Sequence, residues 1–172
     1  MPVTAGLVLQ GDHSLPEVCA PLAHEMERCF SVVDVGAGPF DSLWLFASPD
    51  HERIVEELSW DVPFLANTST HGFRPGSLPR LAPHLLVGEW SYYYLIDASE
   101  AEASRRAREL ATHIGDLSEE YLQRLAAEAD MLICHVDGWW EIFTSRPEWR
   151  ELLVAVLPGC RGRPLSEAGT AP

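Results

Sequence analysis

The seven histidines are the side chains best suited to bind a metal ion, and their spacing argues against that role. They are His13, His24, His51, His71, His84, His113 and His135. No two of them have the i, i+2 or i, i+4 spacing that places two imidazoles on one face of a strand or a helix. Cys134 and His135 are adjacent, so on a strand they point to opposite faces. The sequence therefore predicts no metal site.

The residues that could act as nucleophiles or bases belong to no recognisable catalytic motif. The absence of Lys excludes Schiff-base chemistry and a lysine-containing phosphate loop. No G-x-S-x-G elbow occurs, and the four cysteines form no C-x-x-C pair. The polar stretch 67–72 contains His71 between hydroxyl residues, where it could act as a general base; the alternative is a hydrogen-bonded turn. We predict no catalytic residue and no cofactor.

Aromatic residues form the more informative pattern. Alternation along a strand places Trp90, Tyr92 and Tyr94 on one face, and two further Trp residues follow at 139–140. Tyr and Trp commonly anchor protein interfaces, although packing inside the core is the alternative for each ring. Acidic residues adjoin both regions and could steer a basic partner. The predicted binding residues are Trp90, Tyr92, Tyr94, Trp139, Trp140, Glu89 and Glu141.

The charge of the chain favours a basic protein as the partner. The 172 residues contain 26 acidic side chains and 12 basic ones, all of them Arg, for a net charge of −14. An acidic surface repels phosphate backbones, so we expect no binding to nucleic acid.

The sequence predicts a cytoplasmic protein. Residues 1–9 lack the basic region and the long apolar run of a secretory signal. Apolar stretches elsewhere are shorter than the ~20 residues that a membrane span needs, so we expect no membrane association. We therefore expect Cys19, Cys29, Cys134 and Cys160 to be reduced thiols. The exclusive use of Arg in place of Lys is typical of a GC-rich bacterial genome.

Helix-start signals and β-rich runs predict the elements that would position these residues. Ser14, Ser99, Ser118 and Ser145 precede acidic residues, a pattern typical of helix N-termini. We expect helices over 15–30, 49–58, 99–114, 118–129 and 146–157, and Pro21 should kink the first of them or delay its start. We expect strands over 3–10, 31–35, 42–47, 84–96, 131–136 and 139–144. This order predicts one α+β domain with a mixed or antiparallel sheet and about five helices.

A β-hairpin over 131–144 is the strongest local prediction. Asp137-Gly138 separates two β-rich runs and is typical of a two-residue type I′ turn. That turn places Val136 opposite Trp139, and His135 opposite Trp140. Both faces of the hairpin are largely apolar, which predicts a position inside the sheet or one aromatic face turned toward a partner.

Two segments are predicted to be irregular. Residues 59–83 contain four prolines and form a long connection that is either functional or without regular structure. Residues 158–172 are poor in large apolar side chains, which predicts a flexible C-terminal tail after a single domain over 1–157.

These features predict a small acidic protein-binding module. In size, charge and lack of catalytic motifs the chain is similar to the immunity proteins of bacterial toxin systems, which neutralise a partner by binding it. Two alternatives from other classes stay open. One is an enzyme with a dispersed site that combines His71 or His135 with carboxylates. The other is a sensor domain that binds a small molecule between the sheet and the helices.

Overall fold

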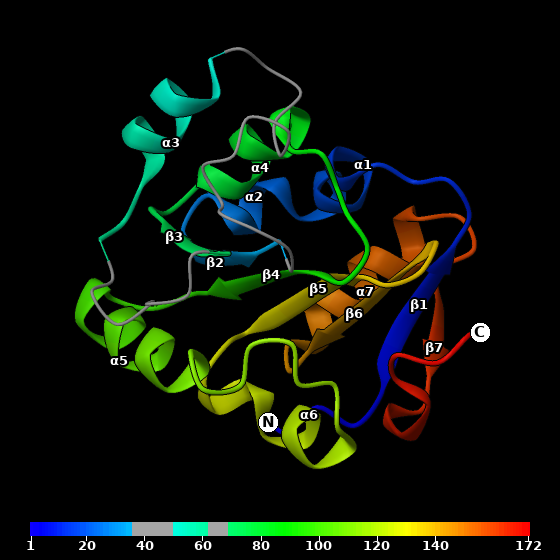
Figure 1. Ribbon diagram of the computed structural model, residues 1–172. Helices are drawn as coiled ribbons and strands as arrows, with labels where there is room; N and C mark the ends of the chain where they lie inside the picture. Colours follow the sequence, from blue (N-terminus) through cyan, green and yellow to red (C-terminus); the bar gives the residue numbers. More distant parts are fainter. Residues whose placement is uncertain (36–49, 62–68) are drawn as a thin grey trace.

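A seven-stranded antiparallel sheet forms the middle layer of the protein, with strand order β3-β2-β4-β5-β6-β1-β7 (Figure 1). The computed structural model describes residues 1–35, 50–61 and 69–172. Each neighbouring pair of strands is antiparallel. The strands are β1 (Gly6–Gln10), β2 (Phe30–Asp34), β3 (Thr70–Phe73), β4 (Ser91–Ile96), β5 (Met131–His135), β6 (Trp139–Thr144) and β7 (Arg161–Arg163). The predicted α+β class is confirmed, whereas the strand predicted over 42–47 lies outside the described residues.

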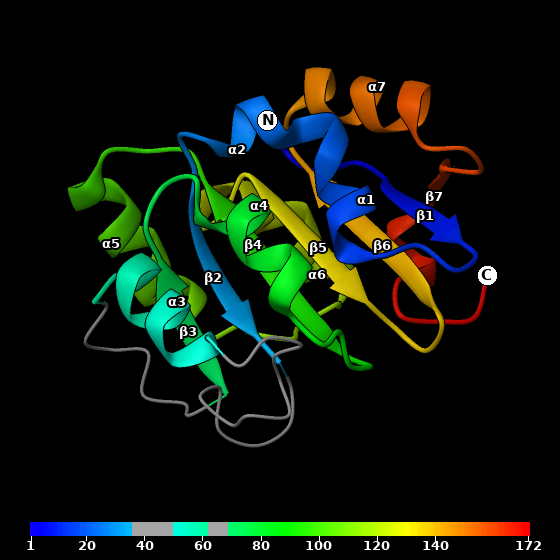
Figure 2. The ribbon, with the colours of Figure 1, turned by 90° about the horizontal axis from the view of Figure 1, so that it is seen from above.

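Helices cover both faces of the sheet, as Figures 1 and 2 show. The first face packs against α1 (Leu15–Cys19), α2 (Ala23–Met26), α3 (His51–Leu58), α4 (Ser77–Leu81) and α7 (Pro147–Val156). The second face packs against α5 (Glu100–Leu110) and α6 (Glu119–Arg124). Short 3-10 turns are η1 (Ala20–Leu22), η3 (Ala82–His84), η4 (Leu125–Ala127) and η5 (Leu165–Glu167).

The central strands are apolar on both sides, so each face of the sheet builds its own core. Tyr93 and Ile133 belong to the core under α1, α4 and α7, whereas Tyr94 and Leu132 belong to the core under α5 and α6. Strand alternation produces this division, because successive side chains point to opposite faces. Burial on both faces explains why the runs in β4 and β5 are almost continuously apolar.

The predicted hairpin is present with the predicted register. His135 lies opposite Trp140, and the Val136 N–H donates to the Trp139 carbonyl at 2.9 Å. The turn type is wrong: a type I′ turn needs positive φ at both central residues, and of these only Gly138 has one, at +86°. Instead, the Gly138 N–H donates to the Val136 carbonyl at 2.8 Å, which closes a three-residue turn around Asp137.

The predicted helix starts are confirmed at three of four serines. Ser14 forms the complete capping box with Glu17, while Ser99 and Ser118 each accept one backbone N–H. The single helix predicted over 15–30 is instead two short helices, α1 and α2, separated by η1, which contains Pro21; helical structure ends at Met26, and β2 begins at Phe30. At α7 the box is absent; the helix begins after Arg146 with Pro147, and the Arg146 N–H is bound by Thr144 Oγ1.

Two sequence predictions about strand content are corrected by the structure. The segment predicted as a strand over 84–96 forms β4 only from Ser91, because residues before it form η3 and an irregular connection that ends at Trp90. The connection predicted to be irregular over 59–83 contains β3, paired with β2, and α4. Pro79 fits this helix because it lies in the first turn of α4, where a missing N–H breaks no intrahelical bond.

The segment predicted as a flexible tail, 158–172, is part of the sheet and its packing. β7 pairs with β1, and Leu165 is buried against the α5–α6 face. A buried ion pair between Arg163 and Glu141 of β6 holds this segment. Composition alone misjudged it, because its main attachment is polar and depends on a residue 22 positions earlier in the chain.

Candidate functional site

The seven predicted binding residues separate into buried and exposed groups. Tyr94, Trp140 and Glu141 are at most 1% exposed, and Tyr92 is also buried. Trp90 is 42% exposed, Glu89 is exposed beside it, and Trp139 is half-buried. The structure therefore leaves Glu89, Trp90 and Trp139 at the surface, all near one end of the sheet.

The buried members have clear structural partners. The Tyr94 hydroxyl accepts the Gly115 N–H at 3.0 Å, and burial raises the pKa of Tyr94 above its ordinary range. The Trp140 indole N–H donates to the His13 carbonyl at 2.9 Å, which ties β6 to the loop before α1. Both rings are core residues, the alternative that the sequence had left open.

The exposed end of the sheet, which we call the hairpin end, consists of three connections: residues 11–14, residues 85–90 and residues 136–139. Pairing of Gln10 with Trp139 places the first beside the hairpin tip. Pairing of Ser91 with His135 places the second beside it on the other side. In both Figure 1 and Figure 2 the hairpin tip and the β1–α1 loop lie side by side.

Trp90 is the most unusual residue of the hairpin end. It is the one non-glycine residue with a positive φ, +59°, in the part of the chain that the structure describes. That conformation is unfavourable for a bulky side chain and is often retained where it positions a functional group. Here it turns the indole toward the C-terminal segment, where its ring edge lies 3.9 Å from the Cβ position that a side chain at Gly169 would have.

Each connection of the hairpin end carries one acidic side chain without a partner. Among the described residues, Asp12, Glu89 and Asp137 form no hydrogen bond or ion pair through their carboxylates. No Arg occurs in residues 11–14, 85–90 or 136–139, so no guanidinium in these connections offsets the negative charge.

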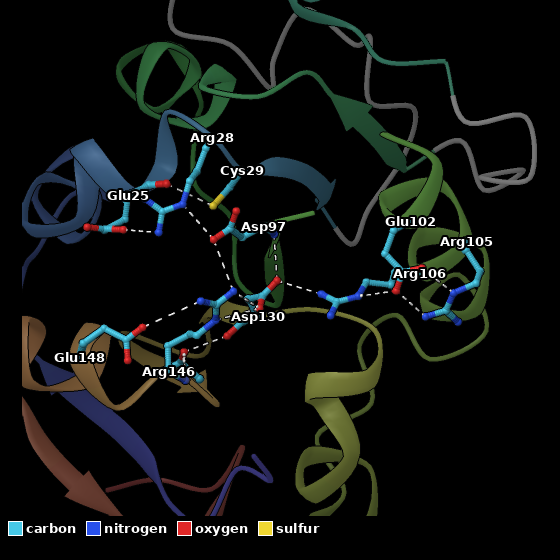
Figure 3. A network of polar contacts seen from close by, with 11 residues as sticks. Glu25, Arg28, Cys29, Asp97, Glu102, Arg105, Arg106, Asp130, Arg146 and Glu148 are labelled. Carbon is cyan, nitrogen blue, oxygen red and sulfur yellow. Dashed lines mark hydrogen bonds and ion pairs between the residues drawn. The ribbon is translucent and has the colours of Figure 1, made fainter. Parts of the chain in front are cut away.

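At the opposite end of the sheet the carboxylates are paired with arginines, as Figure 3 shows. There Arg28 binds Asp97 at 2.9 Å, and Arg106 and Arg146 each bind Asp130 at 2.9 Å. Asp97 follows β4 and Asp130 precedes β5, so these ion pairs fasten the loops at this end. These arginines are therefore engaged within the chain, whereas the acids at the hairpin end have no Arg partner among the described residues.

A cavity of about 410 Å³ opens at the hairpin end, on the face covered by α1 and η3. His13 and His135 both line it, and Trp140 forms part of its wall. The His135 ring packs edge-on against Trp140 with centroids 4.7 Å apart, and its Nδ1 lies 3.1 Å from the Gly88 carbonyl oxygen.

His71, which the sequence left open as a general base or as part of a hydrogen-bonded turn, has a hydroxyl partner, but the geometry opposes catalysis. His71 Nε2 lies 2.8 Å from Ser59 Oγ at the end of α3. The single Ser59 hydroxyl proton is donated to the Val55 carbonyl, so Nε2 must be the donor in this contact. An imidazole that donates to the hydroxyl cannot remove its proton. The pair joins α3 to β3.

The cysteines are poorly suited to nucleophilic chemistry. All four are buried free thiols. Burial raises the pKa of Cys19 and of Cys29 to about 12 and also raises the pKa of Cys134 and Cys160. At neutral pH the reactive thiolate is therefore scarce.

Residues 1–35, 50–61 and 69–172 contain no group of three or more His, Cys, Asp or Glu side chains arranged to hold a metal ion. In the same residues, no helix has the length and apolar character needed to cross a membrane.

Comparisons with known proteins assign no relative to this chain. No protein-family model matches it, and neither the curated proteins nor the solved structures contain a significant match. The arguments about function therefore rest on the site itself.

Sequence reasoning missed Asp12, His13 and Asp137 as members of the site. Their signal was present but distributed, since each lies in a connection at the end of a predicted strand. Only the pairing of β1 with β6 brings Asp12 beside the hairpin tip, and that pairing joins segments about 130 residues apart.

Proposed function

We propose that this protein is a binding module that docks a basic protein through the hairpin end of its sheet, in the manner of bacterial immunity proteins. One observation carries the proposal. Three neighbouring connections each present an unpaired carboxylate, one of them carries the exposed Trp90, and none of them contains an Arg.

The acids and the aromatic ring would contribute differently. Asp12, Glu89 and Asp137 would accelerate encounter with a cationic surface, an effect that salt screens. Trp90 would slow dissociation, because an exposed indole can stack on a guanidinium or bury apolar surface. Its backbone conformation sets the direction of its Cα–Cβ bond before binding, which lowers the ordering cost of association.

We place this activity in a bacterial cytoplasm, because four buried free thiols suit a reducing compartment. The enzyme alternative that used His71 has less support, since Ser59 donates its proton to Val55.

The test is to ask which acidic surface a simple polycation selects. Octa-arginine is titrated into the isotopically labelled full chain, and backbone amide shifts are followed by NMR. We expect the largest shifts at residues 11–14, 85–90 and 136–139, and we expect affinity to fall steeply with added salt. Shifts spread evenly over α3, α5 and α7 would overturn the proposal.

Matched variants sharpen this test. Glu89→Gln with Asp137→Asn removes two acids from the hairpin end, which should cost about 0.4–2 kcal/mol, a roughly twofold to thirtyfold loss of affinity. Glu148→Gln with Glu151→Gln removes the same charge from α7 and should leave affinity nearly unchanged. Trp90→Ala should raise the dissociation rate about twofold to fivefold, as expected for an exposed cation–π contact. Equal losses in the two double variants would mean that only net charge matters, which would refute a localised site.

A further inference from the structure

The cavity at the hairpin end combines apolar walls with side chains that accept hydrogen bonds. Its walls come from the β1–α1 connection, from residues 82–87 and from His135 and Trp140. Much of this lining is apolar, including Leu15, Leu85 and Val87. At about 410 Å³ the cavity lies in the lower part of the range of roughly 300–1,000 Å³ typical of ligand pockets.

The tautomer of His135 follows from its backbone contact. A carbonyl oxygen can only accept, so the neutral ring must carry its proton on Nδ1, which faces the Gly88 carbonyl at 3.1 Å. Nε2 is then left with a lone pair and has no partner among the described residues. His135 thus presents a hydrogen-bond acceptor held in place by the backbone and by the Trp140 ring.

Asp12 adds a negatively charged acceptor to the same cavity, and its carboxylate is unpaired within the described chain. His13, which also lines the cavity, already has partners within the chain. Its Nδ1 lies 3.7 Å from the Glu17 carboxylate, and its backbone carbonyl accepts the Trp140 indole N–H. None of the described residues that line the cavity is an Arg. The matching ligand group therefore has a cationic head that only donates hydrogen bonds, joined to an aliphatic stem that packs on the apolar wall.

We propose that this cavity receives an arginine side chain of the basic partner. This rests on the proposed function of the hairpin end and specifies which group of the partner enters it. A guanidinium has five N–H donors and no acceptor, so it can bind the Asp12 carboxylate and the His135 Nε2 lone pair together. Its methylene stem lies against Leu85 and Val87. Lysine has the same charge but a single compact head, which makes simultaneous contact with both acceptors less favourable.

The test uses n-butylguanidine, which reproduces the arginine side chain without a peptide, on the full chain by NMR. We expect saturable shifts of the Trp140 indole N–H and of the Leu85 and Val87 methyl groups, with millimolar affinity. The neutral isostere n-butylurea should bind at least about fivefold more weakly, and n-pentylamine should fall between the two. Equal binding of n-butylurea, or no saturable shift up to roughly 50 mM, would overturn the proposal.

Two matched substitutions separate the cavity from the surrounding charge. Asp12→Asn should weaken n-butylguanidine binding about fivefold, whereas Asp137→Asn, which removes the same charge outside the cavity lining, should change it less than about twofold. Equal effects would refute a role for the cavity. If octa-arginine selects the hairpin end while n-butylguanidine leaves the cavity signals unchanged, the arginine pocket is wrong and the docking surface stands. If octa-arginine binds elsewhere, both proposals fail.

Discussion

Replacement of Arg163 by Met should strongly destabilise the protein. Glu141 is fully buried, and its carboxylate accepts from Arg163 Nη1 at 2.7 Å, from the Gly169 N–H at 2.9 Å and from the Trp139 indole at 2.9 Å. Arg163→Met leaves this carboxylate buried without its counter-charge, a change that typically costs about 3–5 kcal/mol. Two N–H donors remain, so we expect the lower end, about 3 kcal/mol.

Substitution of the other member of the ion pair, Glu141→Gln, should cost less stability. In Glu141→Gln the amide oxygen can still accept the Gly169 N–H. Arg163 Nη2 still donates a hydrogen bond to the Thr170 carbonyl at 2.6 Å. We expect a loss of about 1.5–2.5 kcal/mol, within the range for one hydrogen bond to a charged group. The double variant contains no buried charge without a partner at position 141, so it should lose less than the sum of the single variants.

Urea unfolding followed by tryptophan fluorescence measures these differences. With a slope of about 2 kcal/mol per molar urea, Arg163→Met should lower the midpoint by roughly 1.5 M. Arg161→Met is the matched control, because Arg161 is exposed on the same short strand and should change stability by less than about 0.5 kcal/mol. A loss below about 1 kcal/mol in Arg163→Met, or strict additivity in the double variant, would refute the argument that this buried pair holds the C-terminal segment.

Four further outcomes follow from local geometry. Gly138→Val should lower the urea midpoint through a cost of about 1–2 kcal/mol, because φ is +86° and a Cβ there meets no atom within 4 Å, so the cost is conformational; an unchanged midpoint would contradict the assigned turn. Ser14→Ala should lose about 1 kcal/mol in the same assay through loss of the capping box. Hydrogen bonding from Arg105 lowers the pKa of Glu102 to about 2. The ionised Glu102 therefore stabilises the protein above its ordinary pKa near 4.5, and this stabilisation is lost as the pH falls toward 2. Glu102→Gln should flatten the fall in thermal midpoint over that pH interval. Because burial raises the pKa of Cys19 and Cys29 to about 12, a disulfide thiol reagent at pH 8 should label the native protein slowly and all four thiols after unfolding; rapid native labelling would contradict the buried environment.

Local patterns predicted the parts of the fold that depend on neighbours in sequence. The 131–144 hairpin and the Ser14 capping box involve residues a few positions apart, so propensity and spacing determined them. The turn type was missed because the Val136 carbonyl accepts the Gly138 N–H, and a three-residue turn replaces the expected two-residue one.

Elements whose stability depends on distant partners could not be predicted in this way. β3 has only four residues and forms because β2 supplies its hydrogen bonds. β7 forms because β1 offers an open edge and Glu141 holds Arg163. Composition describes neither condition, since both arise only when the sheet is assembled.

The sequence predicted only part of the candidate site, because burial of a strand face depends on helices that are distant in the sequence. The aromatic pattern identified Trp90 and Trp139 and placed Glu89 beside them. The aromatic pattern also included Tyr92, Tyr94 and Trp140, which the helices on the two faces bury. A sequence cannot distinguish an exposed face from one that a helix covers when both faces of the strand are apolar.

The distribution of charge gives the two ends of the sheet different roles. At one end, Arg28, Arg106 and Arg146 satisfy Asp97 and Asp130, so charge there holds loops together. At the hairpin end the acids have no partner in the described chain, and Trp90 retains an unfavourable backbone conformation. Neither feature stabilises the folded monomer, because like charges repel and a positive φ costs free energy. Substitutions at Glu89 or Asp137 should therefore leave the stability unchanged or raise it while weakening binding, whereas substitutions at Asp130 should lower stability and leave the docking surface intact.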